Sequence, residues 1–230
     1  MKRQLLLDSQ LPTDTPYIEI GGVKWATTSL ITDVRTGKNY FADLPETLGS
    51  MFQWGRRYGA PSSVTTCQTG KLSIAQGEDL SNASKLIGNP WSANPGPYQY
   101  AWCSEIGTSA YSKLWTSSKG EYDPCPDGWR VPTSEELMSL QNAAYRQRGY
   151  RNGIEGWTCG DNERQTVFIP YQPNMSWSVP NLDPAFVSVL SCTLGNNQTH
   201  YILDIGKTYE RFNVQTSFQS TGGIIRAVKM

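Results

Sequence analysis

The stretch Asp123-Pro-Cys-Pro-Asp-Gly-Trp-Arg-Val-Pro-Thr-Ser-Glu-Glu-Leu137 says more about the fold than any other part of this chain. Its first part contains three prolines and one glycine: Pro124, Pro126, Gly128 and Pro132. Proline fixes φ and moves the preceding residue out of the helical region, so this part is predicted to be extended and turning. Thr133 and Glu136 then stand at the spacing of a capping box, which predicts that a helix begins there.

The residues after the capping box continue the helical pattern. Leu137, Leu140 and Ala144 fall on one helical face, and Gly149 stands where such a helix could stop. The stretch therefore places Trp129 just ahead of a capped helix, which is a structural device. Nothing in it resembles a catalytic motif.

The composition is typical of a loop-rich extracellular protein. The 230 residues include 21 glycines, 14 prolines, 8 tryptophans and 12 tyrosines, and large aromatic side chains can pin long connections onto a small core. The 20 basic and 20 acidic residues balance, charged residues make up only 17% of the chain, and no segment concentrates lysine and arginine. Nucleic acid is therefore not an expected partner, and neither is an anionic membrane surface.

No apolar run is long enough to span a membrane, since the longest, Phe186–Leu190 and Ile224-Ile225, have the length of strands. The apolar part of Met1–Leu7 is shorter than the core of a signal peptide. We expect a secreted, extracellular or cell-surface protein whose signal peptide is absent from this chain. The alternative is a protein that leaves its cell by another route, such as a component of a virion tail.

The cysteines and the histidine restrict the chemistry. Five cysteines make an odd number, so at least one has no partner within a monomer, and no two of them form a Cys-x-x-Cys pair. His200 is the only histidine, which argues against zinc sites and against histidine-based nucleophilic triads. We expect no metal site and no cofactor.

The chain is predicted to consist of a tail or arm over residues 1–16 and a single domain over residues 17–230. Tyr17–Ile20 alternates like a strand, and Gly21-Gly22 after it is either a hairpin turn or a bulge. Residues 33–121 show little regularity apart from a short turn near Asp79–Leu86. Such a long irregular stretch suits a fold that carries long loops on a small sheet.

After the capped helix, residues 149–164 are predicted to be a loop rich in glycine and asparagine, followed by a strand at Val167–Pro170. Four later segments alternate, are separated by turn residues, and predict a meander of three or four antiparallel strands: Phe186–Leu190, Tyr201–Ile205, Arg211–Val214 and Ile224–Val228.

The stretch at 123–137 also resembles the signature of the Fibrobacter succinogenes major paralogous domain family, in which a cysteine-proline-x-glycine-tryptophan element leads through a proline into a helix. Ile20–Leu30 is similar to the opening strand of that family, Phe52–Gly55 to its aromatic-glycine element, and Gly223–Lys229 to its closing strand. The order of these pieces carries the resemblance. We expect structural roles for the following residues of the matched pieces: Trp25, Trp54, Cys125, Trp129, Thr133 and Glu136.

The resemblance implies an α+β fold of the C-type-lectin-like class, with small antiparallel sheets, one or two helices and long irregular loops. The sulfatase-modifying-factor enzymes and the variable receptor-binding proteins of phages and retroelements share this class. Many members of the resembled family carry a second cysteine in the closing strand, where this chain has Ala227. If Cys125 forms a disulfide here, Cys103 is the candidate partner.

The acidic residues that could serve an enzyme also have structural explanations. Glu135-Glu136 at a helix N-terminus suits helix capping, and Asp161 and Glu163 suit a solvated turn. Asp79 and the segment Asn181–Asp183 offer fragments of a calcium site without a loop signature. The enzymes of the sulfatase-modifying type use a C-terminal cysteine pair, whereas only Cys192 lies in the final third. We therefore expect no enzyme.

The segment Gly195–Gln219 is the best candidate for a binding surface. In a meander, one face packs inward and the other displays amides, phenols and an arginine, which can bind a sugar or a protein epitope. Variable receptor-binding proteins display their diversified residues in a similar region. The alternative is an ordinary solvated strand face. The predicted ligand-binding residues are Asn196, Asn197, Tyr201, Tyr209, Arg211, Asn213, Gln215 and Ser217.

Three functions are compatible with these patterns. The first is a non-enzymatic ligand-binding or adhesion domain at a bacterial surface, with a cell-surface glycan or protein as its partner. The second is a receptor-binding component of a phage tail, trimeric through residues 1–16. The third, least favoured, is an enzyme of the sulfatase-modifying type. The sequence leaves the oligomeric state open.

Overall fold

The computed structural model describes residues 16–88, 101–176, 179–181, 186–196, 199–207 and 211–230. Within these ranges the chain forms small sheets, mostly antiparallel, with few helices, which is an α+β arrangement. The predicted arm lies outside the described residues except for Pro16, whose carbonyl accepts a hydrogen bond from the amide of Thr27.

One four-stranded sheet, which we call the closing sheet, joins the beginning, the middle and the end of the described chain. In spatial order its strands are β1 (Tyr17–Ile20), β2 (Val23–Ala26), β18 (Val228–Lys229) and β8 (Trp129–Arg130). Val228 pairs with Trp25 on one side and with Arg130 on the other. Gly21 and Gly22 have φ angles of 56° and 80° and form a two-residue hairpin turn, which decides between the turn and the bulge.

The helix predicted from the capping box is α2 (Ser134–Gln141). Thr133 Oγ1 accepts from the amide of Glu136 at 3.2 Å, and Glu136 Oε2 accepts from the amide of Thr133 at 2.8 Å. The predicted capping box is therefore confirmed. Leu137 and Leu140 are fully buried, as their spacing predicts.

The helix is shorter than predicted, and the segment after it is a hairpin instead of a loop. Three antiparallel strands form a sheet there: β9 (Tyr145–Arg151), β10 (Ile154–Asn162) and β11 (Gln165–Pro170). Ala144 is exposed beyond the end of α2, and Gly149 lies inside β9. Asn152 and Gly153, with φ angles of 47° and 81°, form the turn between β9 and β10. Asn-Gly is strongly favoured in such turns, so strand pairing replaces the helical pattern.

The long irregular region carries only short elements. They are β3 (Leu30–Asp33), β4 (Lys38–Phe41), β5 (Phe52–Gln53), β6 (Cys67–Thr69), α1 (Ile74–Gly77), the 3-10 turn η1 (Leu80–Asn82), β7 (Leu86–Gly88) and the 3-10 turn η2 (Tyr111–Lys113). The turn predicted near residues 79–86 is η1. Trp54, Trp102 and Trp115 are almost completely buried, so the aromatic side chains do pin this region onto the core.

Three antiparallel strands form what we call the C-terminal sheet: β14 (Val187–Leu194), β15 (Thr199–Ile205) and β16 (Phe212–Phe218). The predicted meander therefore has three strands, and a fourth strand over residues 224–228 is wrong. Two other short strands complete the sheet that contains β5: β12 (Asn174–Ser176) and β13 (Val179–Asn181). The glycines before residue 224 form β17 (Gly222–Gly223) between β12 and β5, while Val228 belongs to the closing sheet.

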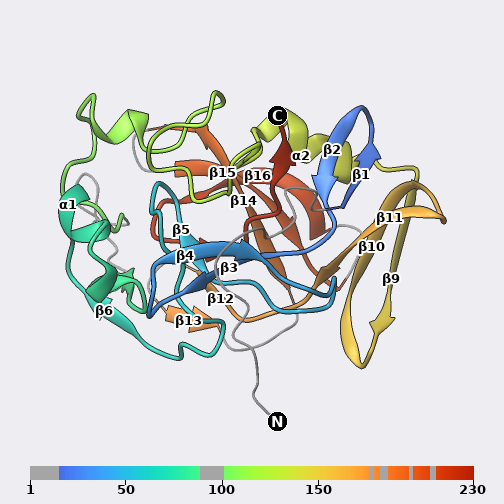
Figure 1. Cartoon of the computed structure of the whole chain (residues 1–230), viewed down its shortest axis with the longest axis horizontal. Helices are drawn as coiled ribbons and strands as arrows, with labels where there is room; N and C mark the ends of the chain where they lie inside the picture. The colour runs from blue at the N-terminus through green and yellow to red at the C-terminus, as the bar shows by residue number, and fades with distance from the viewer. Residues whose placement is uncertain (1–15, 89–100, 177–178, 182–185, 197–198, 208–210) are drawn as a thin grey trace, which may run out of the picture.

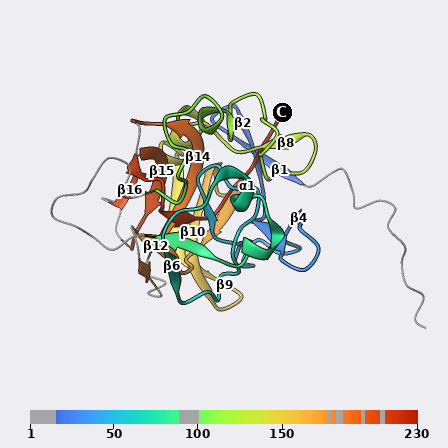
Figure 2. The same cartoon turned by 90° about the vertical axis from the view of Figure 1, so that its left-hand side faces the viewer.

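Helix α2 packs against β15 and β16, and Leu137 shares a buried cluster with Leu203, Ile205 and Phe212. Figure 1 shows β9, β10 and β11 on one side of the molecule and α1 and β6 on the other, with the C-terminal sheet between them. Figure 2 views the molecule from the side of α1. The face of the C-terminal sheet opposite α2 is therefore the one left to the predicted binding residues.

Candidate functional site

The polar residues of the C-terminal sheet gather around one carboxylate. Asp204, whose side chain is 7% exposed, accepts at Oδ2 from Arg211 Nε and from Gln215 Nε2, each at 3.0 Å. The Arg211 guanidinium also lies over the Phe186 ring, with 4.3 Å between Cζ and the ring centroid. Two donors on one carboxylate oxygen and an aromatic ring against the cation hold these side chains in a defined arrangement.

Strand register explains why these residues meet. Asp204 of β15 pairs with Asn213 of β16, and His200 pairs with Ser217. Side chains of directly paired residues point to the same face of a sheet, and residues two apart in a strand share that face. The predicted binding residues Asn213, Gln215 and Ser217 therefore share one face with Asp204.

The other predicted binding residues do not all join this group. Tyr201 pairs with Thr216. It stands an odd number of residues before Asp204 in the same strand, so its side chain points to the opposite face of the sheet. The expectation that the whole set lies on one outward face of the sheet is therefore wrong for Tyr201. Asn196 is exposed in the turn after β14, where its Oδ1 accepts from the Thr199 hydroxyl. Asn197 and Tyr209 lie outside the described residues.

Arg211, Gln215 and Ser217 line a hollow of about 280 Å³, which we call the Asp204 hollow. Asn174 of β12 also lines it; this residue is 2% exposed, and its Oδ1 accepts no hydrogen bond from the described residues. Nearly all buried polar groups in proteins have a partner, so this amide is a position at which a ligand can supply one. The sequence did not point to Asp204 or Asn174. Neither residue stands in a local pattern from which its neighbours on other strands could be inferred.

His200 lies on the same sheet face but has a different role. It is fully buried, and neither ring nitrogen has a hydrogen-bond partner among the described residues. Burial lowers the pKa of its imidazole to about 3, so the ring is neutral at physiological pH and acts as a packing group.

Two side chains that sequence reasoning missed hold the stretch at 123–137. Lys119 Nζ donates to the carbonyls of Cys125 at 2.5 Å and of Trp129 at 2.8 Å. Asp123 Oδ1 accepts from the amide of Cys125, and its Oδ2 accepts from the amide of Val131, both at 2.9 Å. The prolines restrict the backbone of this stretch, and these two charged groups satisfy much of its remaining hydrogen bonding.

The residues expected to be structural are placed accordingly. Trp25, Trp54 and Trp129 are almost completely buried, and the Trp25 indole donates to Ser139 Oγ of α2 at 3.0 Å. Arg130 forms a bidentate pair with Glu136, with Nη1–Oε2 of 2.7 Å and Nη2–Oε1 of 2.5 Å. The capping glutamate therefore also ties α2 to β8 in the closing sheet.

The proposed disulfide between Cys103 and Cys125 is wrong. Both are buried free thiols of the same core cluster, and residue 227 in the closing segment is alanine, which cannot form a disulfide. Burial raises the pKa of Cys103 to about 11 and that of Cys192 to about 12. Thiols with such pKa values hold little thiolate at neutral pH and are poor nucleophiles.

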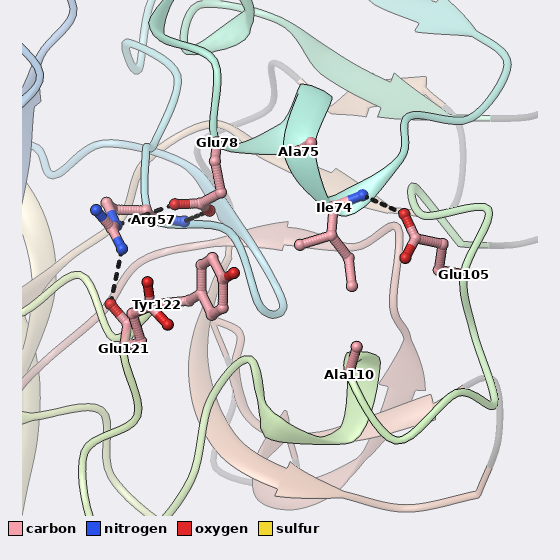
Figure 3. Close-up of a pocket in the computed structure, with 8 residues that line it drawn as sticks. All are labelled: Arg57, Ile74, Ala75, Glu78, Glu105, Ala110, Glu121 and Tyr122. Atoms are coloured by element: carbon pink, nitrogen blue, oxygen red, sulfur yellow. Dashed lines mark hydrogen bonds and ion pairs between the residues drawn. The ribbon is translucent and has the colours of Figure 1, made fainter.

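A second hollow, of about 460 Å³, lies between α1 and the loop that carries Glu105 and Glu121 (Figure 3). Figure 3 shows Arg57 Nε paired with Glu78 Oε2 at 3.0 Å and Arg57 Nη2 donating to the Glu121 carbonyl at 2.8 Å. Glu105 Oε1 accepts from the amide of Ile74 at 2.9 Å. Burial is the main reason that the pKa of Glu78 is raised. These contacts join three loop segments, so the polar groups here act in holding the loops together.

Two of the acidic residues considered for catalysis or calcium binding, Asp161 and Asp79, have structural partners. Asp161 accepts from the amide of Gly21 through both carboxylate oxygens at 3.2 Å, and Asp79 caps η1 by accepting from the amide of Ser81 at 2.9 Å. Asp183 lies outside the described residues. In the described part of the chain, no group of three or more His, Cys, Asp or Glu side chains is placed to hold a metal ion.

No helix in the described ranges is long and apolar enough to cross a membrane. Comparisons of the chain with protein-family models, with curated proteins and with solved structures found no match. The Asp204 hollow and the residues that line it are therefore the features of the chain that bear on its function.

Proposed function

We propose that this chain is a non-enzymatic extracellular ligand-binding or adhesion domain that recognises a glycan or a protein at a cell surface through the Asp204 hollow. The observation that carries the proposal is the convergence of Arg211 and Gln215 on Asp204 beside the amide oxygen of Asn174, which has no partner among the described residues. A concave site with a few convergent polar groups is the usual form of a small-ligand site. Three of the residues predicted from sequence to bind a ligand line this hollow.

We also propose that the fold is C-type-lectin-like. The pairing of β2 with β18, the capped helix α2 and the long loops supported by buried tryptophans are the features that support this assignment. They agree with the order of motifs in the family that the sequence resembles. One fold can carry many functions, and the chemistry of this chain is determined by the residues of the hollow.

The binding function is favoured over catalysis by the state of three potentially reactive groups, Asp204 in the hollow and His200 and Cys192 elsewhere in the C-terminal sheet. The Asp204 carboxylate is engaged by two donors, and the His200 ring is buried with its pKa lowered to about 3. Cys192, the cysteine of the final third, has its pKa raised to about 12 by burial. A sulfatase-modifying type of chemistry would need a reactive thiol there.

The test is a binding experiment on intact bacterial and host cells with the wild-type protein and Arg211→Ala. Loss of the guanidinium removes one of the two donors to Asp204 and leaves this carboxylate without its ion-pair partner. We therefore expect about tenfold weaker binding. Arg35→Ala is the matched control, because Arg35 is also paired with an aspartate, at 3.4 Å from Asp33, but is 87% exposed and distant in the chain.

Thermal denaturation of each variant confirms that it is folded before binding is compared. Wild-type affinity in a folded Arg211→Ala protein would exclude the Asp204 hollow as the binding site. Binding to a bacterial receptor by a trimer would favour the phage-tail setting over a bacterial adhesin.

A further inference from the structure

The described residues that line the Asp204 hollow carry no net charge. The charged groups among them are Asp204 and Arg211, and they form an ion pair with 3.0 Å between Nε and Oδ2. A charged ligand would have to lose hydration and then meet a site whose own charges already cancel, which is unfavourable without an opposite charge to pair with. The hollow therefore suits an uncharged group.

Asn174 determines what kind of uncharged group fits. Its side-chain amide is 2% exposed, lines the hollow and has an oxygen without a partner among the described residues. An amide presents both a donor and an acceptor, and a hydroxyl group can pair with either. Leaving a buried polar atom unpaired is unfavourable, so a ligand hydroxyl that donates to this amide oxygen gains affinity.

The remaining lining groups have the same character. Ser217 and Thr221 bring hydroxyl groups 2.7 Å apart, Gln215 brings an amide, and the rings of Phe186 and Phe218 supply apolar surface. At about 280 Å³, the hollow lies just below the range of roughly 300–1,000 Å³ that holds drug-sized ligands. Hydroxyl partners, apolar ring surface and this size together suit one pyranose ring.

We infer that the Asp204 hollow binds a single neutral sugar unit at the end of a glycan, with adjacent hydroxyl groups paired to Asn174 and to the Asp204–Arg211–Gln215 group. This inference rests on the proposed function and chooses the glycan over the protein partner. Arg211 and Asp204 act here as a matched donor and acceptor, and Asn174 acts as the specificity-determining residue.

The test compares wild type, Asn174→Leu and Ser217→Ala on an array of neutral glycans, sialylated and uronic-acid glycans, and short peptides. We expect wild type to bind neutral glycans, and Asn174→Leu to bind them about tenfold more weakly because a hydrogen-bond partner is lost. Leucine has the same number of heavy side-chain atoms and removes the oxygen that has no partner among the described residues. Asn174→Leu should therefore melt close to the temperature of wild type. A purely structural role for Asn174 would instead lower the melting temperature and the binding together.

If Asn174→Leu fails to fold, Ser217→Ala provides the same comparison with a smaller truncation. Binding of wild type to acidic glycans or peptides alone, still sensitive to Arg211→Ala, would overturn the inference and leave the proposed function standing. A wild-type protein that binds no glycan on the array would also overturn it. Cell binding that Arg211→Ala leaves unchanged would remove the proposed function as well.

Discussion

The irregular region between β4 and β8 and the C-terminal sheet are both well packed, but their backbone groups find hydrogen-bond partners in different ways. In the irregular region, side chains serve the backbone: the Trp102 indole donates to the carbonyl of Trp54 at 2.6 Å, and the Trp115 indole donates to that of Tyr122 at 3.2 Å. In the C-terminal sheet, β15 pairs with a strand on each side, so the backbone satisfies itself.

This difference determines where a binding site can be placed. A side chain that must cap a loop carbonyl has a fixed partner and is not available to a ligand. In the sheet, the ladder leaves the polar side chains of alternate positions available, and these are the ones that gather at Asp204. The loops therefore provide most of the irregular surface, while the sheet provides the hollow that we propose to be the site.

The largest effect is expected from Trp102→Ala, which removes a loop anchor. Trp102 is 1% exposed, and a Cβ at Gly77 would lie 2.6 Å from its ring, so the surroundings are closely packed. The substitution should lower the free energy of unfolding by about 3–5 kcal/mol, measured by urea denaturation. Tyr150→Ala is the control, because Tyr150 is 74% exposed, and it should change stability by less than about 0.5 kcal/mol. Equal effects of the two substitutions would mean that the rings do not hold the loops.

A smaller loss is expected from Lys119→Met, which keeps the length of the side chain and removes its ammonium group. The carbonyls of Cys125 and Trp129 would each lose a charged donor. The free energy of unfolding should fall by about 3 kcal/mol in the same denaturation experiment. Lys38→Met, at an exposed lysine of β4, is the matched control. No difference between the two lysine variants would show that the stretch at 123–137 is held by its prolines alone.

The smallest effect concerns the sheet and depends on pH. The pKa of His200 falls from 6.5 to about 3 on folding, so between these values the unfolded chain binds a proton that the folded chain does not. Stability is therefore lost as pH falls from about 6.5 toward 3, and His200 should contribute a loss of about 2 kcal/mol between pH 7 and pH 5. Denaturation of wild type and His200→Leu at both pH values isolates this contribution. Identical pH dependence in the two proteins would mean that His200 is protonated inside the fold.

The sequence predicted the parts of the fold that local patterns specify. The capping box of Thr133 and Glu136, the alternation in the C-terminal strands and the anchoring role of the aromatic residues were all available within short windows. The hairpin after α2 is also signalled, by Asn152-Gly153, although the glycine and asparagine content of residues 149–164 predicts a loop there.

The parts that the sequence did not predict depend on partners far away in the chain. The position of Tyr201 on the opposite face follows from the register between β15 and β16, and no single strand reports that register. Asp204 becomes the centre of the site because Arg211 and Gln215 reach it from the neighbouring strand, while Asn174 comes from another sheet. The hollow forms only when separate strands pack together. The sequence could therefore predict some of its lining residues one by one, but it could not predict that they form one site.

The closing sheet also has a consequence for how the chain folds. Strand β2 forms its hairpin with β1 from neighbouring residues, but its other edge is covered by β18 near the far end of the chain. Closing so long a loop is slow and entropically costly, so the hairpin forms well before its partner strand arrives. During that interval β2 presents an open edge that can pair with the β18 of another molecule. Refolding yield should therefore fall as protein concentration rises, with exchanged closing strands as the characteristic by-product.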